Sequence, residues 1–246
     1  MKTGRWWKNR EEPAGDAGDL ERVAQINARA PVPIEVPGTP LPSPASNGAS
    51  PRVDEAILRE EHHHQYGGPW AKGKYRFEFL VESGLRPEHR LLDIGCGSLR
   101  IGVPAIGYLE PGNYFGVESH LFSLEAAATY EVPLHGLEAK RPRLLWDANF
   151  SFSHFGTTFD WVIDSATSTG IGKHPERLEL LFRNVAGVLE PGGRLLIVPR
   201  PVVALEQMRE WGLAIVRENV VQRCPLLEGH EEDFKSVNTW FEFERV

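Results

Sequence analysis

The sequence predicts an α/β fold with a Rossmann-like, mostly parallel sheet, and three observations lead to this prediction. The apolar segment at residues 90–94 runs directly into two closely spaced glycines, which is typical of a buried parallel strand that turns into a helix. Two further apolar segments, residues 114–118 and 158–164, each end in an acidic residue. Residues 175–189 carry apolar side chains at helical spacing. Strands and helices that alternate in this way favour a parallel sheet with helices on both faces.

The turn after the first of these strands indicates a cofactor site. Gly95 and Gly97 allow a sharp turn and let a ligand lie against bare backbone, and we expect a helix from Ser98 onward whose first amides face that ligand. A dinucleotide fingerprint needs a third glycine where this chain has Arg100. The Gly-Lys-Ser/Thr ending of a P-loop is also missing from this turn. The loop therefore favours a different cofactor.

Asp93 stands two residues before the first glycine, and the loop Asp-Ile-Gly-Cys-Gly-Ser-Leu-Arg resembles that of class I S-adenosylmethionine (SAM) methyltransferases. The Gly-Cys-Gly-Ser-Leu-Arg variant is similar to a bacterial subfamily of these enzymes. The resemblance implies SAM as the cofactor, with Asp93 near its methionine end and the backbone of Gly95 and Gly97 beneath it. Cys96 and Arg100 lie in the same loop and are expected beside the cofactor. The usual turn has a third small residue where this chain has Leu99.

Later strand ends are expected to complete the site. Glu118 ends the second strand, where its carboxylate can accept hydrogen bonds from both ribose hydroxyls. The resemblance implies an acid after the third strand that meets the adenine amino group, a role open to Asp147 or Asn149, and an apolar side chain on the ring. Phe150 suits that last role, with an ordinary core aromatic as the alternative. Asp164 ends the fourth strand, at the edge where a substrate would meet the methyl group.

The resemblance covers roughly residues 75–246 and implies a seven-stranded sheet with one antiparallel strand near its edge. The Phe-Arg-Asn-Val-Ala-Gly-Val-Leu-Glu-Pro-Gly-Gly segment is similar to the family's helix and turn after its fourth strand. The remaining spacing predicts short helices at residues 75–82, 123–129 and 203–211, and strands at residues 143–146, 194–198, 213–221 and 238–245.

The first 52 residues differ in composition from the rest, which predicts a domain boundary near residue 52. Residues 30–51 are rich in Pro, Gly, Ser and Ala and are expected to form an extended linker outside the core. A short helix is possible at residues 19–30. The tail as a whole is expected to be disordered or weakly structured, and the alternative is a segment that docks a partner protein through Trp6 and Trp7.

The methyltransferase domain is expected at residues 53–246, and its first part, residues 53–84, is expected to form two helices that cover the cofactor cleft. The first of these helices carries His62 and two further histidines directly after it. Consecutive helical residues point about 100° apart, so the three imidazoles cannot bind one ion from one face. Catechol-type enzymes carry an Asp-Asn pair where this chain has Pro199-Arg-Pro201. No metal is expected.

Charge and composition limit the possible partners. The chain of 246 residues has a net charge of −7, and phosphate contacts dominate nucleic-acid affinity, so DNA and RNA are disfavoured. No apolar run approaches the ~18 residues of a membrane span, and no signal-peptide core is visible. Two cysteines, Cys96 and Cys224, do not make a disulfide framework. These observations favour a cytoplasmic protein that acts on a small molecule.

The expected function is SAM-dependent methyl transfer to an oxygen or nitrogen of a small or medium-sized acceptor. Proximity and orientation can supply much of the rate of such a transfer. A general base would help a hydroxyl acceptor, and the candidates are Asp164, His62 and His154. One alternative is a non-catalytic SAM-binding module that regulates or assembles a partner. A nicotinamide-dependent oxidoreductase is disfavoured by the missing third glycine.

Overall fold

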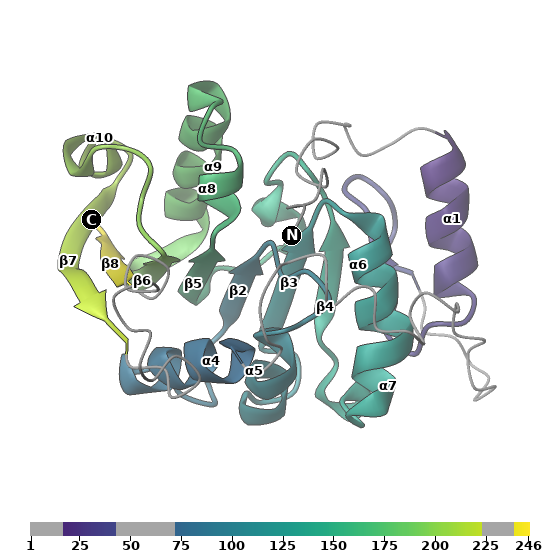
Figure 1. Cartoon of the computed structure of the whole chain (residues 1–246). Helices are drawn as coiled ribbons and strands as arrows, with labels where there is room; N and C mark the ends of the chain where they lie inside the picture. Colours follow the sequence, from purple (N-terminus) through teal and green to yellow (C-terminus); the bar gives the residue numbers. More distant parts are fainter. Residues whose placement is uncertain (1–16, 43–71, 223–238) are drawn as a thin grey trace, which may run out of the picture.

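The computed structural model describes residues 17–42, 72–222 and 239–246, which form an eight-stranded sheet with helices packed against it (Figure 1). The strand order is β1-β4-β3-β2-β5-β6-β8-β7. Strand β8 is antiparallel to both of its neighbours, and all other neighbouring pairs are parallel. The strands are β1 (Ile34–Glu35), β2 (Leu91–Ile94), β3 (Tyr114–Glu118), β4 (Arg143–Trp146), β5 (Phe159–Ser165), β6 (Leu189–Val198), β7 (Leu213–Val221) and β8 (Thr239–Arg245).

Successive residues of the central strands point to opposite faces of the sheet and build two cores. Leu91 packs in one core with Ile163, and Leu92 packs in the other with Val162. Apolar residues of α1, α4, α5 and α6 belong to the first core, and those of α9 and α10 to the second. The helices are α1 (Ala17–Asn27), α4 (Lys72–Glu82), α5 (Gly102–Tyr108), α6 (Leu121–Ala126), α7 (Val132–Leu134), α8 (Thr167–Gly170), α9 (Pro175–Val188) and α10 (Leu205–Glu210).

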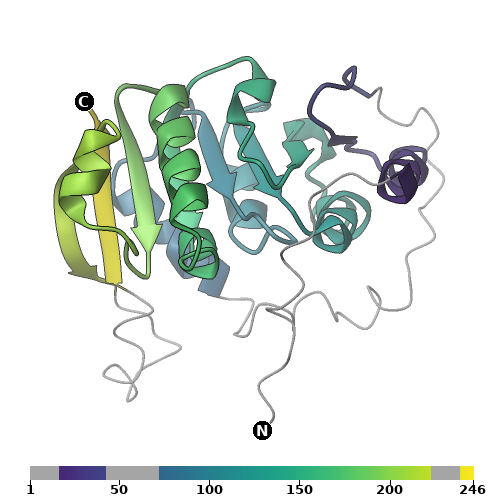
Figure 2. The same ribbon diagram turned by 90° about the horizontal axis from the view of Figure 1, so that it is seen from above.

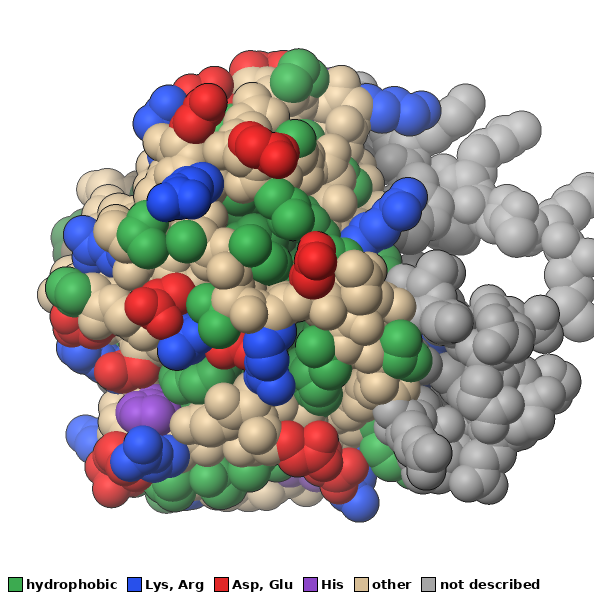
Figure 3. Space-filling model, turned by 90° about the vertical axis from the view of Figure 1, so that its left-hand side faces the viewer, with side chains coloured by type: hydrophobic (Ala, Val, Ile, Leu, Met, Phe, Trp, Pro, Cys, Tyr) green, Lys and Arg blue, Asp and Glu red, His purple; other side chains and the backbone are tan. Residues whose placement is uncertain are grey.

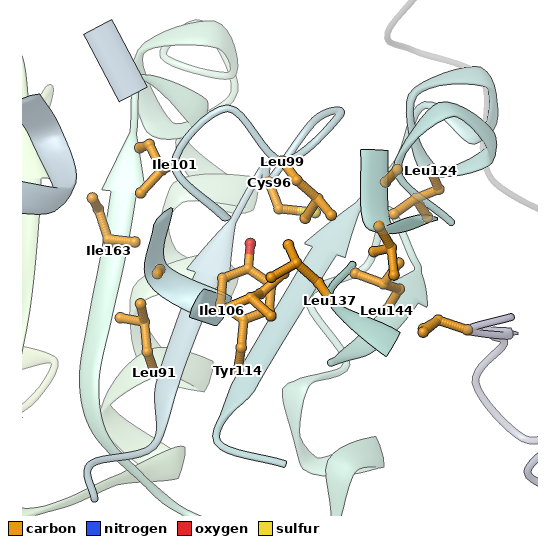
Figure 4. Close-up of a cluster of buried hydrophobic side chains, with 14 of the residues drawn as sticks. Leu91, Cys96, Leu99, Ile101, Ile106, Tyr114, Leu124, Leu137, Leu144 and Ile163 are labelled. Atoms are coloured by element: carbon orange, nitrogen blue, oxygen red, sulfur yellow. The ribbon is translucent and has the colours of Figure 1, made fainter. Parts of the chain in front are cut away.

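The first core lies directly beneath the glycine loop (Figure 4). Cys96 and Leu99 reach down from the loop, and the ring of Tyr114 extends upward from β3 toward them. Leu99 is fully buried and has a φ of +68°, which is the left-handed region that L-residues avoid. The loop is therefore held from below by apolar side chains of the chain itself.

The N-terminal segment corrects two expectations from the sequence. Residues 30–51 were expected to be a linker outside the core, but Ile34–Glu35 forms strand β1, which pairs in parallel with β4 and raises the strand count from seven to eight. Val32 and Ile34 are buried at 4% and 1% exposure. The composition was misleading because Pro is tolerated at a sheet edge, and the residues between the prolines here are apolar except for Glu35.

Ion pairs also attach this segment to the domain. Arg22 and Arg29, on and just after α1, both contact the buried carboxylate of Glu125 on α6. On β1, Glu35 accepts two hydrogen bonds of 2.7 Å from the guanidinium of Arg143. Helix α1 thus lies beside α6 at one end of the sheet, and β7 and α10 lie at the other end (Figures 1 and 2).

Other predicted elements are present with shifted boundaries. The helix expected from Ser98 begins only at Gly102, because left-handed residues at Gly97 and Leu99 interrupt a right-handed helix. The helix expected at residues 123–129 starts at Leu121 and continues through a π-helical turn, Ala127–Glu131, into α7. The first expected covering helix and the residues 1–16 of the tail lie outside the described residues.

Strand β7 forms one edge of the described sheet, and β1 forms the other; the β7 side is seen in Figure 3. Its exposed Ile215 and Val216 are followed by Arg217 and Glu218, and hydrophobic side chains on this face alternate with charges of both signs. The register of β7 against β8 shifts on both sides of Arg217. Charges and irregular register on an edge strand disfavour pairing with another sheet. None of the described helices is long and apolar enough to cross a membrane.

Candidate functional site

A pocket lies at the carboxyl ends of β2, β3, β4 and β5. Beyond β2 the chain continues to β3 on one side and later returns to β5 on the other, so the strand order reverses at β2. Open α/β sheets bind ligands at such a reversal. The pocket is lined by eight of the predicted cofactor residues: Asp93, Gly95, Cys96, Gly97, Arg100, Glu118, Asp147 and Phe150.

The glycine loop forms the floor of this pocket. Gly95 and Gly97 have φ values of +72° and +57°, a conformation that favours glycine. A Cβ on Gly95 would lie 2.0 Å from Oγ1 of Thr167, at the start of α8. The amides of Gly95 and Cys96 both donate to the carbonyl of Val117, at 2.8 and 3.1 Å. The loop is thus tied to β3 and packed against α8, and no side chain fits at its first glycine.

Glu118, at the end of β3, also holds the glycine loop in place. Its carboxylate Oε2 accepts a hydrogen bond from the amide of Gly97 at 3.1 Å, and its Oε1 accepts one from the amide of His120 at 2.8 Å. The side chain is buried, lines the pocket and keeps acceptor capacity, because an ionised carboxylate has about four lone-pair sites. A carboxylate at this strand end is suited to accept hydrogen bonds from vicinal hydroxyls.

Asp93 is a buried acid at the base of the pocket. Its Oδ2 accepts a hydrogen bond of 2.8 Å from the hydroxyl of Tyr114, and Oδ1 has no hydrogen-bond partner in the part of the chain that the structure describes. The pKa of Asp93 is raised from 3.8 to about 7, mainly because the carboxyl group is buried. The hydrogen bond from Tyr114 and the charge of Arg76 oppose this rise, and the nearby carboxylates of Glu118 and Asp164 add to it. A buried oxygen of this kind is suited to accept a hydrogen bond from a ligand.

The loop after β4 supplies the far wall. Asp147 accepts hydrogen bonds from the amides of Asn149 and Ser151, at 3.0 and 2.6 Å, and so holds the turn in which Phe150 has a φ of +58°. The guanidinium of Arg177, from α9, lies 5.5 Å from the centre of the Phe150 ring and donates to the carbonyl of Ala148 at 2.7 Å.

Three predicted site residues lie elsewhere, and one is outside the described residues. Asn149 is exposed and does not line the pocket, whereas its neighbour Ala148 does. Asp164 is also not a lining residue. The left-handed turn at Ala166 directs the amides of residues 167 and 168 onto the Asp164 carboxylate, which accepts both. Burial raises the pKa of Asp164, and its carboxylate accepts hydrogen bonds from the first two amides of α8.

His154, another candidate base, also lies outside the pocket. Its Nε2 lies 3.0 Å from Glu35, in the ion cluster with Arg143 at the amino end of β4, whereas the pocket lies at the carboxyl ends of the strands. His62 lies outside the described residues. Cys96 is a lining residue of the pocket, but its side chain packs in the first core beneath the loop. Burial raises the pKa of its thiol well above the usual range, so the thiol stays protonated at neutral pH.

Sequence reasoning missed three of the four basic residues that line the pocket. Lys72 and Arg76 reach it from α4, and Arg177 reaches it from α9. A sequence signal for Lys72 and Arg76 was available: they are four residues apart, which places both side chains on one face of a helix. Arg76 also donates a hydrogen bond to the hydroxyl of Ser165 at the end of β5.

The fold is similar to solved structures of low sequence identity. Magnesium protoporphyrin IX methyltransferase (ChlM) from Synechocystis PCC 6803, which is described with bound SAM, matches with a TM-score of 0.55, 14% identity, and coverage of 82% of this chain and 100% of that chain. DesVI from Streptomyces venezuelae matches with a TM-score of 0.50, 16% identity, and coverage of 79% and 100%. TrmN from Thermus thermophilus matches with a TM-score of 0.50 and 19% identity over 69% of this chain, but only 48% of its own length.

No family model matches the chain. The structural likeness nevertheless defines the architecture: the chain has the class I fold of SAM-dependent methyltransferases, here with the additional edge strand β1. The expected fold class is thereby confirmed in its layers, its mostly parallel sheet and its antiparallel strand β8.

Proposed function

We propose that the protein binds SAM in this pocket and transfers its methyl group to an oxygen or nitrogen of a small or medium-sized acceptor. The observation that carries the proposal is the left-handed glycine loop held against Glu118, at the point where the strand order reverses. The pocket offers SAM three features. Its floor is bare backbone, the Glu118 carboxylate can accept hydrogen bonds from the ribose hydroxyls, and the buried Asp93 can accept one from the methionine end. ChlM, which has the same fold, is described with SAM.

The residues divide the pocket into two sides. Glu118 accepts hydrogen bonds from the ribose, and Asp147, Ala148 and Phe150 surround the adenine on the β4 side. Oδ1 of Asp93 accepts a hydrogen bond from the ammonium group at the methionine end. The acceptor approaches from the β5 side, where Ser165 and Thr167 line the pocket. When bound, SAM supplies a methyl group already activated by its sulfonium, so alignment by these residues provides much of the rate.

Calorimetric titration tests the cofactor site. We expect SAM and its demethylated product S-adenosylhomocysteine (SAH) to bind, and NAD not to bind. Glu118→Ala should weaken SAM binding by roughly 1–3 kcal/mol, since it removes charge-assisted hydrogen bonds and the contact that holds the loop. Glu118→Gln should cost less because it keeps one acceptor, and the exposed Glu110→Ala is the control. Equal affinities in all four proteins would remove Glu118 from the site.

Transfer of label from methyl-labelled SAM separates an enzyme from a SAM-binding module. An enzyme incorporates label into a product when it is mixed with a metabolite extract, whereas a regulatory or assembly module binds SAM without any transfer. The net charge of −7 on this protein favours a small acceptor over a nucleic acid. Label that appears only in RNA or DNA would therefore contradict this part of the proposal.

A further inference from the structure

The two oxygens of Asp93 are in different situations. Oδ2 accepts a hydrogen bond of 2.8 Å from the hydroxyl of Tyr114, whereas Oδ1 has no hydrogen-bond partner among the described residues. Asp93 is 1% exposed and lines the pocket. Buried polar oxygens are rarely left without a donor, so Oδ1 indicates that a donor arrives with a ligand.

The register of the sheet brings Tyr114 to Asp93. The parallel pairing of β2 with β3 places Tyr114 opposite Leu91, and Gly116 opposite Asp93. Side chains alternate along a strand, so Tyr114 and Asp93 project from the same face of the sheet. The ring of Tyr114 extends upward from the start of β3, with its oxygen at the upper end beneath the glycine loop (Figure 4). The hydroxyl therefore meets the carboxyl group from below.

The hydroxyl of Tyr114 is a fixed and neutral donor. Tyr114 is 1% exposed, and a Cβ on Gly102, at the start of α5, would lie 2.6 Å from its oxygen, so a larger residue at that position would crowd the hydroxyl. Burial raises the pKa of the hydroxyl well above its usual range, and the charge of Asp93 adds to this rise. The hydroxyl therefore keeps its proton at neutral pH and donates it to Asp93.

We propose that Tyr114 is a positioning residue for the cofactor: its hydroxyl holds Oδ2 of Asp93, and this leaves Oδ1 directed at the ammonium group of SAM. This role rests on the SAM site proposed above, and Tyr114 acts through Asp93 without itself lining the described pocket. Without the hydroxyl, the carboxyl group can rotate about its Cβ–Cγ bond, for which aspartate has only broad preferences. A hydrogen bond behind a ligand-binding side chain keeps that side chain in its binding geometry.

Two ligands that differ at the methionine end test this role by calorimetry. SAH carries the ammonium group, whereas methylthioadenosine keeps the adenosine and the sulfur but lacks the amino-acid part. Tyr114→Phe should raise the dissociation constant of SAH by roughly tenfold and leave that of methylthioadenosine within roughly twofold of the wild type. Equal losses for the two ligands would mean that Tyr114 supports the loop as a whole, and unchanged SAH binding would mean that it supports neither; both results overturn the proposal.

Tyr108→Phe is the matched control. Tyr108, on α5, packs against the same core, and its hydroxyl donates to the carbonyl of Leu85 at 3.1 Å. The substitution makes the same chemical change away from Asp93, so it should leave the affinities for SAH and methylthioadenosine unchanged.

The pH dependence of SAH binding is a readout that a purely structural role would not move. The ammonium contact needs an ionised Asp93, whose pKa is about 7, so the affinity for SAH should rise with pH through this value. The hydrogen bond from Tyr114 lowers the pKa of Asp93, so Tyr114→Phe should move the midpoint to higher pH, whereas Tyr108→Phe should not. The other titratable or charged groups around Asp93 are kept in both variants: Glu118 of β3, Asp164 of β5, Lys72 and Arg76 of α4, and Cys96 and Arg100 of the loop. A midpoint that stays in place would contradict the assigned role.

A double-mutant cycle shows whether Tyr114 acts through Asp93. In the Asp93→Ala background, Tyr114→Phe should change the dissociation constant of SAH by no more than roughly twofold, because the group that it positions is already gone. Binding of methylthioadenosine shows that each variant keeps a folded pocket. The same tenfold loss in both backgrounds would mean that Tyr114 acts independently of Asp93. If the wild type binds neither SAM nor SAH, the proposed function itself fails, whereas a wild type that binds SAH and a Tyr114→Phe variant that binds it equally well remove only the role of Tyr114.

Discussion

Asp93 shows how the fold sets the chemistry of a single residue. Its carboxyl group is removed from water at the base of the pocket, and burial is the main reason that its pKa rises from 3.8 to about 7. Between these two values the folded state holds a proton that the unfolded state releases. The free energy of unfolding therefore falls as the pH rises through this range, and the loss is complete above about pH 7.

Asp93→Asn should remove this pH dependence, because the amide keeps the shape and stays neutral. Between about pH 5 and about pH 8, the wild type is expected to lose about 3 kcal/mol of stability more than the variant. Urea unfolding at the two pH values measures the difference. Glu176→Gln, which removes an exposed carboxylate, is the control. Parallel losses in the wild type and Asp93→Asn would show that Asp93 does not titrate in this range.

Leu99 is a strained residue within the glycine loop. It combines a left-handed φ of +68° with a fully buried side chain. Truncation to Ala removes the packing, at about 2–5 kcal/mol, but keeps most of the backbone strain. Truncation to Gly removes the same packing and also relieves strain of about 1 kcal/mol.

We therefore expect Leu99→Gly to be more stable than Leu99→Ala in chemical denaturation, although both are less stable than the wild type. The matched control is Leu124, which is also fully buried but lies in the regular helix α6. At that position the order reverses, and the Gly variant should be the less stable by about 0.5–1 kcal/mol. The same order at both positions would mean that Leu99 is not strained.

At the scale of elements, the contact between α4 and the glycine loop connects the fold to the site. The loop follows β2 and the helix precedes it, and they meet where Gly73 touches the backbone of Arg100. Gly73→Ala should push the helix away from the loop, which we expect to cost about 1–3 kcal/mol of stability and to weaken SAM binding. Thermal unfolding and calorimetry measure the two effects.

Gly107→Ala is the matched control for this prediction. Gly107 also lies in a helix, α5, but an added Cβ would have no atom within 4 Å. The substitution there should leave SAM affinity unchanged and raise stability by about 0.5–1 kcal/mol, because Ala is the better helix former. If Gly73→Ala behaves in the same way as this control, then α4 does not rest on the loop.

The elements that the sequence predicted well are those with a local signal. Helix α9 has strict helical spacing, and β2 and β3 are short apolar runs before a glycine or an acid. The direction of the Asp164 side chain had no such signal, because it depends on a left-handed turn at Ala166, a residue that seldom adopts one. Lys72 was missed for a related reason: only the packing of α4 against the loop brings it to the pocket.

At the scale of the whole molecule, the described N-terminal segment is part of the domain rather than a tail. Helix α1 and strand β1 extend the sheet beyond β4, and Ile26 and Ile34 enter the same core as the side chains beneath the glycine loop. The pair of arginines on Glu125 fixes this segment to α6. A core shared in this way predicts that the segment and the sheet unfold together.

Ile26→Ala tests this cooperativity. Ile26 is 1% exposed, so its truncation should lower the free energy of unfolding by about 2–4 kcal/mol. Because the core is continuous, the whole molecule should still unfold in a single transition with a lower melting temperature. Leu20→Ala, on the same helix but 44% exposed, should change stability by less than about 0.5 kcal/mol. A main transition that stays in place while a minor one moves would mean that α1 and β1 unfold independently of the sheet, and the domain would then begin after them.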